Sequence, residues 1–242
     1  MCSHLDSKNE EISQDVEPLC RYELFNKLWE LSMLRKMTDL EQKTALLLVE
    51  AGECARWEYS ASLHCPDGPL LEFSTEKQHN QANPSSALLD SISAHPNFVL
   101  HHNHLSGESL SFADWRGASN YFNEIYAHCN DGTSYYGKVL NKEEILSLIN
   151  DKKDLIEVNA ENYLFKYTND TKLDAFFRKE VICRALNIRG YVEYGYSWGE
   201  RRIIHQAILT MKIFGIQSIG QLGAACESWI QSAALDLSND KW

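Results

Sequence analysis

Residues 98–104 of this chain read Phe-Val-Leu-His-His-Asn-His, an apolar start followed by four polar side chains. A short apolar run of this kind predicts a buried β-strand, because it is too short for a helix and rich in β-prone residues. Side chains alternate between the two faces of a strand, so His102 and His104 share one face while His101 points to the other. We therefore expect two imidazoles to converge at one end of a buried strand.

The residues that follow this strand supply a third possible ligand. A helix is predicted from Ser111 to about Phe122, which places Asp114 in its first turn. A carboxylate is favourable there because the helix N-terminus carries partial positive charge, and Ser-x-x-Asp is also the spacing of a capping box. Catalytic zinc usually has three protein ligands and leaves its fourth position to water. The sequence thus predicts a zinc site made of His102, His104 and Asp114.

Hydrolysis at such a zinc requires a residue that moves the proton, and glutamate is a suitable one. Glu58 is our candidate because it opens a predicted strand just before a turn at residues 65–68. Glu50 and Glu53 lie close by in the sequence and remain alternatives. The hydroxyl of Ser111 is expected to donate a hydrogen bond to the oxyanion of a tetrahedral intermediate.

Working outward, residues 51–140 predict helices interleaved with about five strands. Residues 1–18 form a polar lead, and the polar turns Cys-Pro-Asp-Gly and Asn-Asp-Gly predict hairpins. Helices are predicted at 20–51, with a break near Thr38, and at 85–94 and 111–122. Strands are predicted at 57–63, 69–73, 98–104, 125–129 and 133–139.

The remainder of the chain has a different pattern, and we place a domain boundary near Leu155. Helices are predicted at 142–150, 173–186, 199–214 and 219–237, interrupted by the aromatic run at 191–198. The predicted organisation is a lead at 1–18, an α/β domain at 19–155 and a helical domain at 156–242. The aromatic run is interpreted as packing between the two domains or, less favoured, as a surface for a partner.

Composition excludes several classes of protein. The formal charge of −11 over 242 residues disfavours nucleic acid as a main partner, because binding phosphates requires an excess of Lys and Arg. No apolar run is long enough to span a membrane, and the acidic start does not resemble a secretory signal, so we expect a cytoplasmic protein. The seven cysteines contain no C-x-x-C pair. Serine-hydrolase, P-loop and Rossmann signatures are absent as well.

The order of a glutamate-bearing strand, His-x-His and Ser-x-x-Asp resembles the JAMM (JAB/MPN) family of zinc metallopeptidases. The stretch Asn-His-Leu-Ser-Gly at 103–107 is similar to the prokaryotic and phage-associated branches of that family. The resemblance covers roughly residues 50–140. It implies an α/β, cytidine-deaminase-like fold with a mixed sheet flanked by helices, to which this chain adds a helical C-terminal extension.

The resemblance also implies a chemistry. It makes Zn²⁺ the cofactor held by His102, His104 and Asp114, Glu58 the general base and Ser111 the oxyanion residue. The implied activity is that of an isopeptidase or peptidase cleaving after the C-terminus of a ubiquitin-like protein, with a protein adaptor possible on the C-terminal helices. Two alternatives stay open: a non-catalytic binding scaffold of the same fold, and a phage- or toxin-associated zinc peptidase acting on ordinary peptide bonds.

Overall fold

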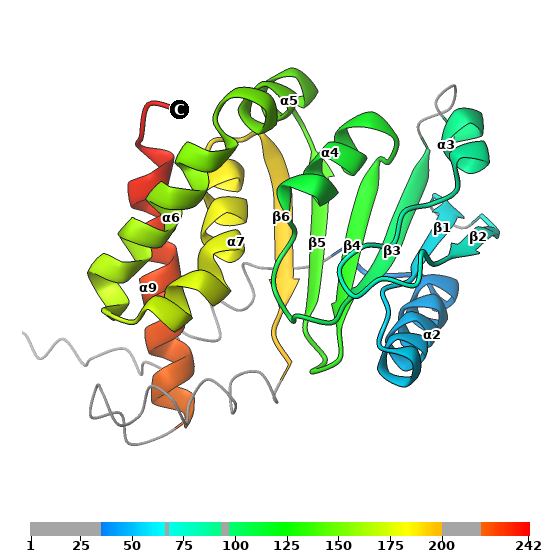
Figure 1. The fold of residues 1–242 in the computed structure, drawn as a ribbon, viewed down its shortest axis with the longest axis horizontal. Coiled ribbons are helices and arrows are strands. Elements are labelled where there is room, and N and C mark those ends of the chain that lie inside the picture. The colour runs from blue at the N-terminus through cyan, green and yellow to red at the C-terminus, as the bar shows by residue number, and fades with distance from the viewer. Residues whose placement is uncertain (1–34, 66–67, 93–96, 200–218) are drawn as a thin grey trace, which may run out of the picture. The chain divides into compact units, whose positions relative to one another are not determined.

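A six-stranded mixed sheet organises this chain (Figure 1). The structure is a computed structural model that describes residues 35–65, 68–92, 97–199 and 219–242, all of which fall in one compact unit, residues 32–242. Along the sheet the strand order is β2-β1-β3-β4-β5-β6, and only the central β3/β4 pair is parallel. The strands are β1 (Ser60–His64), β2 (Leu70–Ser74), β3 (Phe98–His104), β4 (Glu124–Cys129), β5 (Ser134–Val139) and β6 (Val192–Ser197).

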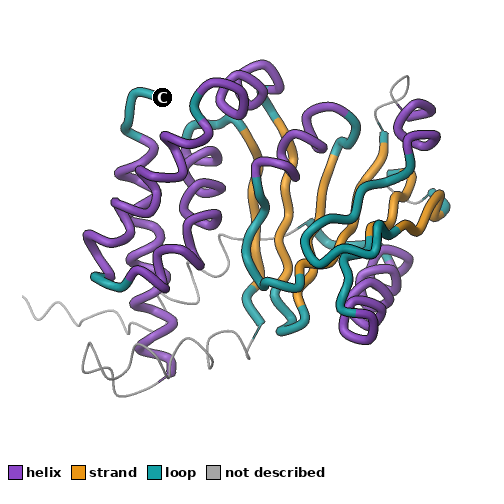
Figure 2. Tube along the Cα trace, viewed as in Figure 1, coloured by secondary structure: helices purple, strands orange, loops and turns teal. Residues whose placement is uncertain are grey.

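Seven helices flank this sheet within the described residues, and Figure 2 separates them by colour from the strands. This arrangement confirms the predicted α/β class with a mixed sheet. The helices are α2 (Asp39–Ala55), α3 (Ser86–Ile92), α4 (Phe112–Asn120), α5 (Lys142–Asp151), α6 (Lys153–Thr168), α7 (Thr171–Ile188) and α9 (Ile219–Ser238).

Strand β3 is buried on both faces, as its apolar start predicts. Val99 packs in a core cluster with Leu48 of α2, whereas Leu100 belongs to the larger core that contains Trp115 of α4. Because side chains alternate along a strand, the even-numbered residues of β3 face α4 and the odd-numbered ones face α2. His102 and His104 therefore lie on the α4 side of the sheet.

Helix α4 lies close to the sheet because β5 carries a glycine beneath it. A Cβ atom at Gly137 would come within 2.6 Å of Cη2 of Trp115 and within 2.7 Å of Leu110. Such contacts are far too short for a close-packed interior. Because Gly137 has no side chain, the indole of Trp115 packs directly on β5. This contact sets the distance between the sheet and the helix that carries Asp114.

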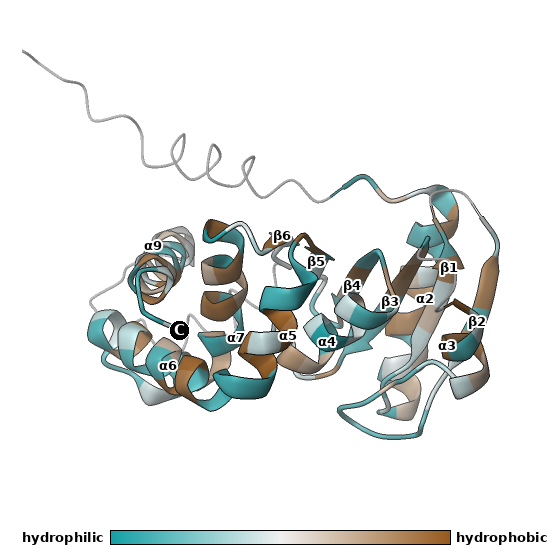
Figure 3. Cartoon of the chain, turned by 90° about the horizontal axis from the view of Figure 1, so that it is seen from above, coloured by the Kyte–Doolittle hydropathy of each residue, from teal (hydrophilic) through white to brown (hydrophobic). Residues whose placement is uncertain are grey.

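The C-terminal half joins the same sheet. Strand β6 pairs antiparallel with β5 along its whole length, and α6, α7 and α9 pack on one another beside it. Figure 3 shows this region from above, with hydrophobic residues in brown. The domain boundary expected near Leu155 lies in the first turn of α6. None of the helices in the described part of the chain is long and apolar enough to cross a membrane.

The five strands predicted before residue 140 are confirmed, with their ends shifted by up to three residues. The predicted helices at 85–94, 111–122, 142–150, 173–186 and 219–237 correspond to α3, α4, α5, α7 and α9. Helix α6 was not expected. The aromatic run, for which no secondary structure was predicted, forms strand β6, because pairing with β5 favours its extended backbone. The first part of the helix predicted at 20–51, the helix at 199–214 and the lead at 1–18 lie outside the described residues.

Candidate metal centre

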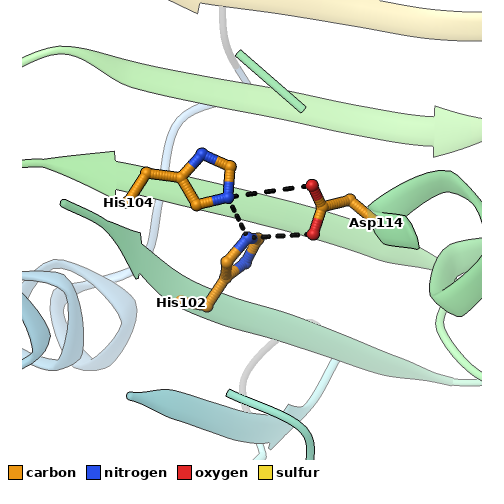
Figure 4. Close-up of side chains that lie close together, drawn as sticks. All are labelled: His102, His104 and Asp114. Atoms are coloured by element: carbon orange, nitrogen blue, oxygen red, sulfur yellow. Dashed lines mark hydrogen bonds and ion pairs between the residues drawn. The ribbon is translucent and has the colours of Figure 1, made fainter. Parts of the chain in front are cut away.

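Two histidines of β3 and one aspartate of α4 meet on the α4 face of the sheet (Figure 4). The Nε2 atoms of His102 and His104 are 2.8 Å apart. Asp114 Oδ1 lies 3.2 Å from Nε2 of His102, and Asp114 Oδ2 lies 3.7 Å from Nε2 of His104. All three side chains are buried or largely buried. The predicted convergence of these groups is confirmed.

The donor atoms fit a small divalent ion. Ligands bonded to zinc at about 2.0–2.1 Å in a tetrahedron are about 3.3 Å apart. The distance of 2.8 Å between the two Nε2 atoms and that of 3.2 Å from Nε2 of His102 to Oδ1 of Asp114 are close to this value. Two imidazoles and one carboxylate also leave one position open for a water or a substrate atom. The same donor set suits several first-row divalent ions, so the geometry fits a metal site without selecting one metal.

Hydrogen bonds with surrounding residues orient two of the three ligand side chains, His104 and Asp114. Nδ1 of His104 lies 2.8 Å from the backbone carbonyl oxygen of Glu108. A carbonyl only accepts, so Nδ1 carries the proton and Nε2 presents its lone pair to the site. Asp114 Oδ2 accepts hydrogen bonds from the backbone N–H of Ser111 at 2.6 Å and from its hydroxyl at 2.7 Å. This leaves Oδ1 of Asp114 directed at His102.

Electrostatics favour the metal-binding protonation states of His104 and Asp114, whereas they favour the protonated form of His102. Burial, together with the nearby His102 ring, lowers the pKa of His104 to about 4, which keeps this imidazole neutral. Burial opposes the charged forms of His102 and Asp114, yet their mutual attraction outweighs it. The pKa of His102 is raised and that of Asp114 is held well below its usual range. Asp114 is therefore a carboxylate, the form that ligates.

Glu58 lies two residues before β1 and lines the same cavity as the three ligands. Its backbone is anchored by a 2.7 Å hydrogen bond to the carbonyl of Gln78. Burial raises the pKa of its carboxyl to about 7, against the opposing influence of His102. Glu50 and Glu53, the alternatives considered from sequence, are exposed on α2, which packs on the other face of β3. Of the three glutamates, only Glu58 lies beside the ligands.

Ser111 is the N-cap of α4, and the capping box with Asp114 is present. Its Oγ accepts from the backbone N–H of Asp114 at 3.3 Å while its hydroxyl proton points to Oδ2 of Asp114. The hydroxyl therefore orients a ligand in this structure. An interaction with an oxyanion requires it to turn away from that carboxylate.

The loop between His104 and Ser111 is held by residues that no local pattern linked to it. Lys179 of α7 forms a 2.9 Å ion pair with Glu108. The hydroxyl of Tyr194, in β6, lies 2.7 Å from Oγ of Ser109, and Cys183 Sγ donates to the carbonyl of Leu110. The C-terminal half thus fixes the loop that spaces the ligands. Sequence offered no signal for these partners, because they lie about 70 to 85 residues away.

His101 occupies the opposite face of β3, as the alternation predicts. Its Nδ1 lies 3.0 Å from Nε2 of His128, and its Nε2 lies 3.5 Å from a carboxylate oxygen of Glu41. Glu41 also pairs with Arg35, which in turn contacts Glu124. This reverse-face network, made of these five residues, holds His101 among protein partners and away from the metal centre.

Comparison with known proteins found no similarity: no family model matches the chain, and neither a curated protein nor a solved structure does. The functional conclusion therefore depends on the chain's own residues and geometry.

Proposed function

We propose that this chain is a zinc-dependent hydrolase of amide bonds, of the JAMM type that the sequence resembles. The observation that carries the proposal is the meeting of His102, His104 and Asp114 at one wall of a cavity of about 380 Å³ that Glu58 also lines. Structural histidine clusters do not require an accessible cavity, whereas catalysis does.

A zinc ion in this position would supply a Lewis acid for the scissile carbonyl and make a nearby water easier to deprotonate. Glu58 would accept the proton of the attacking water and deliver it to the leaving nitrogen, so that the amide is converted to a carboxylate and an amine with no redox change. Asp114 and its Ser111 contacts would keep the ligand geometry constant during the reaction.

The first experiment measures the zinc content of the purified chain and its cleavage of two substrate sets, fluorogenic ubiquitin-like proteins and fluorogenic peptides. We expect stoichiometric zinc and activity lost on chelation. Glu58→Gln should retain zinc and the fold while kcat falls by about 10²–10⁴-fold, the range for losing a general base.

Glu53→Gln is the matched control, since it makes the same chemical change on the exposed surface of α2. It should leave zinc content and cleavage unchanged. Absence of zinc from the wild-type chain, or full activity in Glu58→Gln, would contradict the proposal. Zinc binding without cleavage of either set would instead favour the binding-scaffold alternative.

A further inference from the structure

The cavity at the metal centre is larger than the reacting groups require. An ion and one water fill only a small part of about 380 Å³, because a water molecule takes up about 30 Å³ in the liquid. The volume is within the range of small-ligand sites, about 300–1,000 Å³. The remaining space extends away from the ligands, so it is available to a part of the substrate that does not react.

One part of the wall beyond the ligands is apolar, while the rest carries polar side chains, among them those of residues 79–81 and Lys179. Leu100 and Ile125 on the sheet and Phe122 after α4 are buried members of the main core, and Leu89 and Tyr121 pack against that core at its edge. A charged or strongly polar group placed against this apolar part would lose its hydration without gaining partners there. The apolar part of the wall therefore favours an aliphatic or aromatic side chain.

Gly117 keeps this space open. It is in α4 and lines the cavity, and a Cβ atom built there meets nothing within 4 Å apart from its chain neighbours and the backbone of its own helix. It follows Asp114 by three residues, so it lies on the same face of the helix about 4.5 Å further along the axis. A side chain at this position would project into the open space, one turn away from the metal ligand.

Resting on the proposed function, we infer that the substrate carries a bulky apolar side chain beside the scissile bond and that this side chain occupies the cavity next to Gly117. The ligand class is thus a peptide with leucine, methionine or phenylalanine at that position. A substrate with glycine there would leave the apolar wall in contact with water and forgo the free energy of burial.

The test uses binding as its readout. N-acetyl-leucinamide and N-acetyl-glycinamide are titrated into the full chain, with and without added zinc, and followed by NMR chemical shifts. We expect the leucine probe to bind the wild-type chain about tenfold or more tightly than the glycine probe, as burial of an aliphatic side chain implies. Equal affinities for the two probes would overturn the inference.

Substitutions in α4 test whether the leucine probe binds next to Gly117. Gly117→Leu should abolish the preference for the leucine probe and Gly117→Ala should reduce it, while both keep the fold because alanine and leucine favour helix more than glycine does. Asn120→Leu adds the same side chain to an exposed position of α4 and should leave the preference unchanged. Retention of the preference in a folded Gly117→Leu variant would overturn the inference.

This experiment separates the two proposals. Zinc-dependent cleavage without any preference for leucine would overturn the apolar pocket and leave the proposed hydrolysis standing. A preference for leucine that Gly117→Leu removes, in a chain that holds no zinc, would support the pocket and overturn the hydrolysis.

Discussion

The two faces of β3 use the same residue types for different purposes. On the face toward α4, His102 and His104 converge with Asp114 at a cavity. On the face toward α2, His101 is engaged by His128 and Glu41 in the reverse-face network. All of these histidines are buried, so burial does not distinguish them. The difference is that the Nε2 atoms of His102 and His104 converge with a carboxylate beside a cavity, whereas the ring of His101 lies within the reverse-face network.

Removing a ligand on the cavity face should have the largest effect. His104→Ala is expected to lose zinc and to lower kcat/KM by about 10³-fold or more, because a metal supplies several kcal/mol of transition-state stabilisation. Elemental analysis and cleavage assays check this result, and calorimetry should show a folded chain. Wild-type zinc content in His104→Ala would contradict the assignment of this ligand.

Breaking the reverse-face network should change stability instead of chemistry. Glu41 is buried and pairs with Arg35, whose side chain is 27% exposed and also contacts Glu124. Glu41→Gln should lower the free energy of unfolding by about 3 kcal/mol, the low end for a disrupted buried pair because Arg35 keeps a second partner and some water. Urea unfolding measures the change, and the folded variant should retain its zinc. Loss of zinc at unchanged stability would show that the two faces are not independent.

The ion pair between Glu41 and Arg35 predicts that the free energy of unfolding depends on pH. Burial alone would raise the pKa of Glu41, but hydrogen bonds with His101 and Arg35 outweigh it and hold the pKa below the ordinary value of 4.5. The unfolded chain therefore binds more protons in acid, so this stabilisation is complete above about pH 4.5 and is lost as the pH falls further. Unfolding free energies of the wild-type chain and Glu41→Gln should converge below pH 4.5. A constant difference down to strongly acidic pH would argue against the ion pair.

The smallest effect is expected from substitution of Ser111, the N-cap of α4 that contacts the metal ligand Asp114. Ser111→Ala removes the hydroxyl that donates to Asp114 and caps α4. Stability should fall by about 1 kcal/mol, as for other N-caps. Zinc affinity should fall by about 10- to 100-fold, as for other residues that orient a ligand. Competition with a chelator measures the affinity, and Ser111→Thr should restore most of both quantities. Unchanged zinc affinity in Ser111→Ala would mean that the hydroxyl does not position the carboxylate.

Local patterns were sufficient for the parts of the site that lie close together in sequence. Alternation along residues 98–104 predicted that His102 and His104 share a face and that His101 does not. The capping-box spacing predicted that Asp114 begins a helix beside Ser111. Both predictions depend on backbone geometry that repeats every two residues in a strand or every turn in a helix, so they need no knowledge of the rest of the fold.

Features decided by long-range packing were not predictable in this way. Strand β6 and helix α6 were not expected, because an aromatic run becomes a strand only where a partner edge such as β5 accepts it. The sequence favoured Glu58 because it opens a predicted strand, but the exclusion of Glu50 and Glu53 required the fold, since it depends on which side of the sheet each carboxyl reaches.

The sequence by itself therefore determined the α/β class, the positions of the first five strands along the chain and the three residues that can hold a metal. Only the tertiary structure decided that Lys179 and Tyr194 hold the ligand loop, that Glu58 shares the cavity, and that Gly117 leaves it open beside an apolar wall. The physical reason is range: hydrogen-bond geometry and side-chain alternation act between near neighbours, whereas a cavity is the space that remains after distant segments have packed.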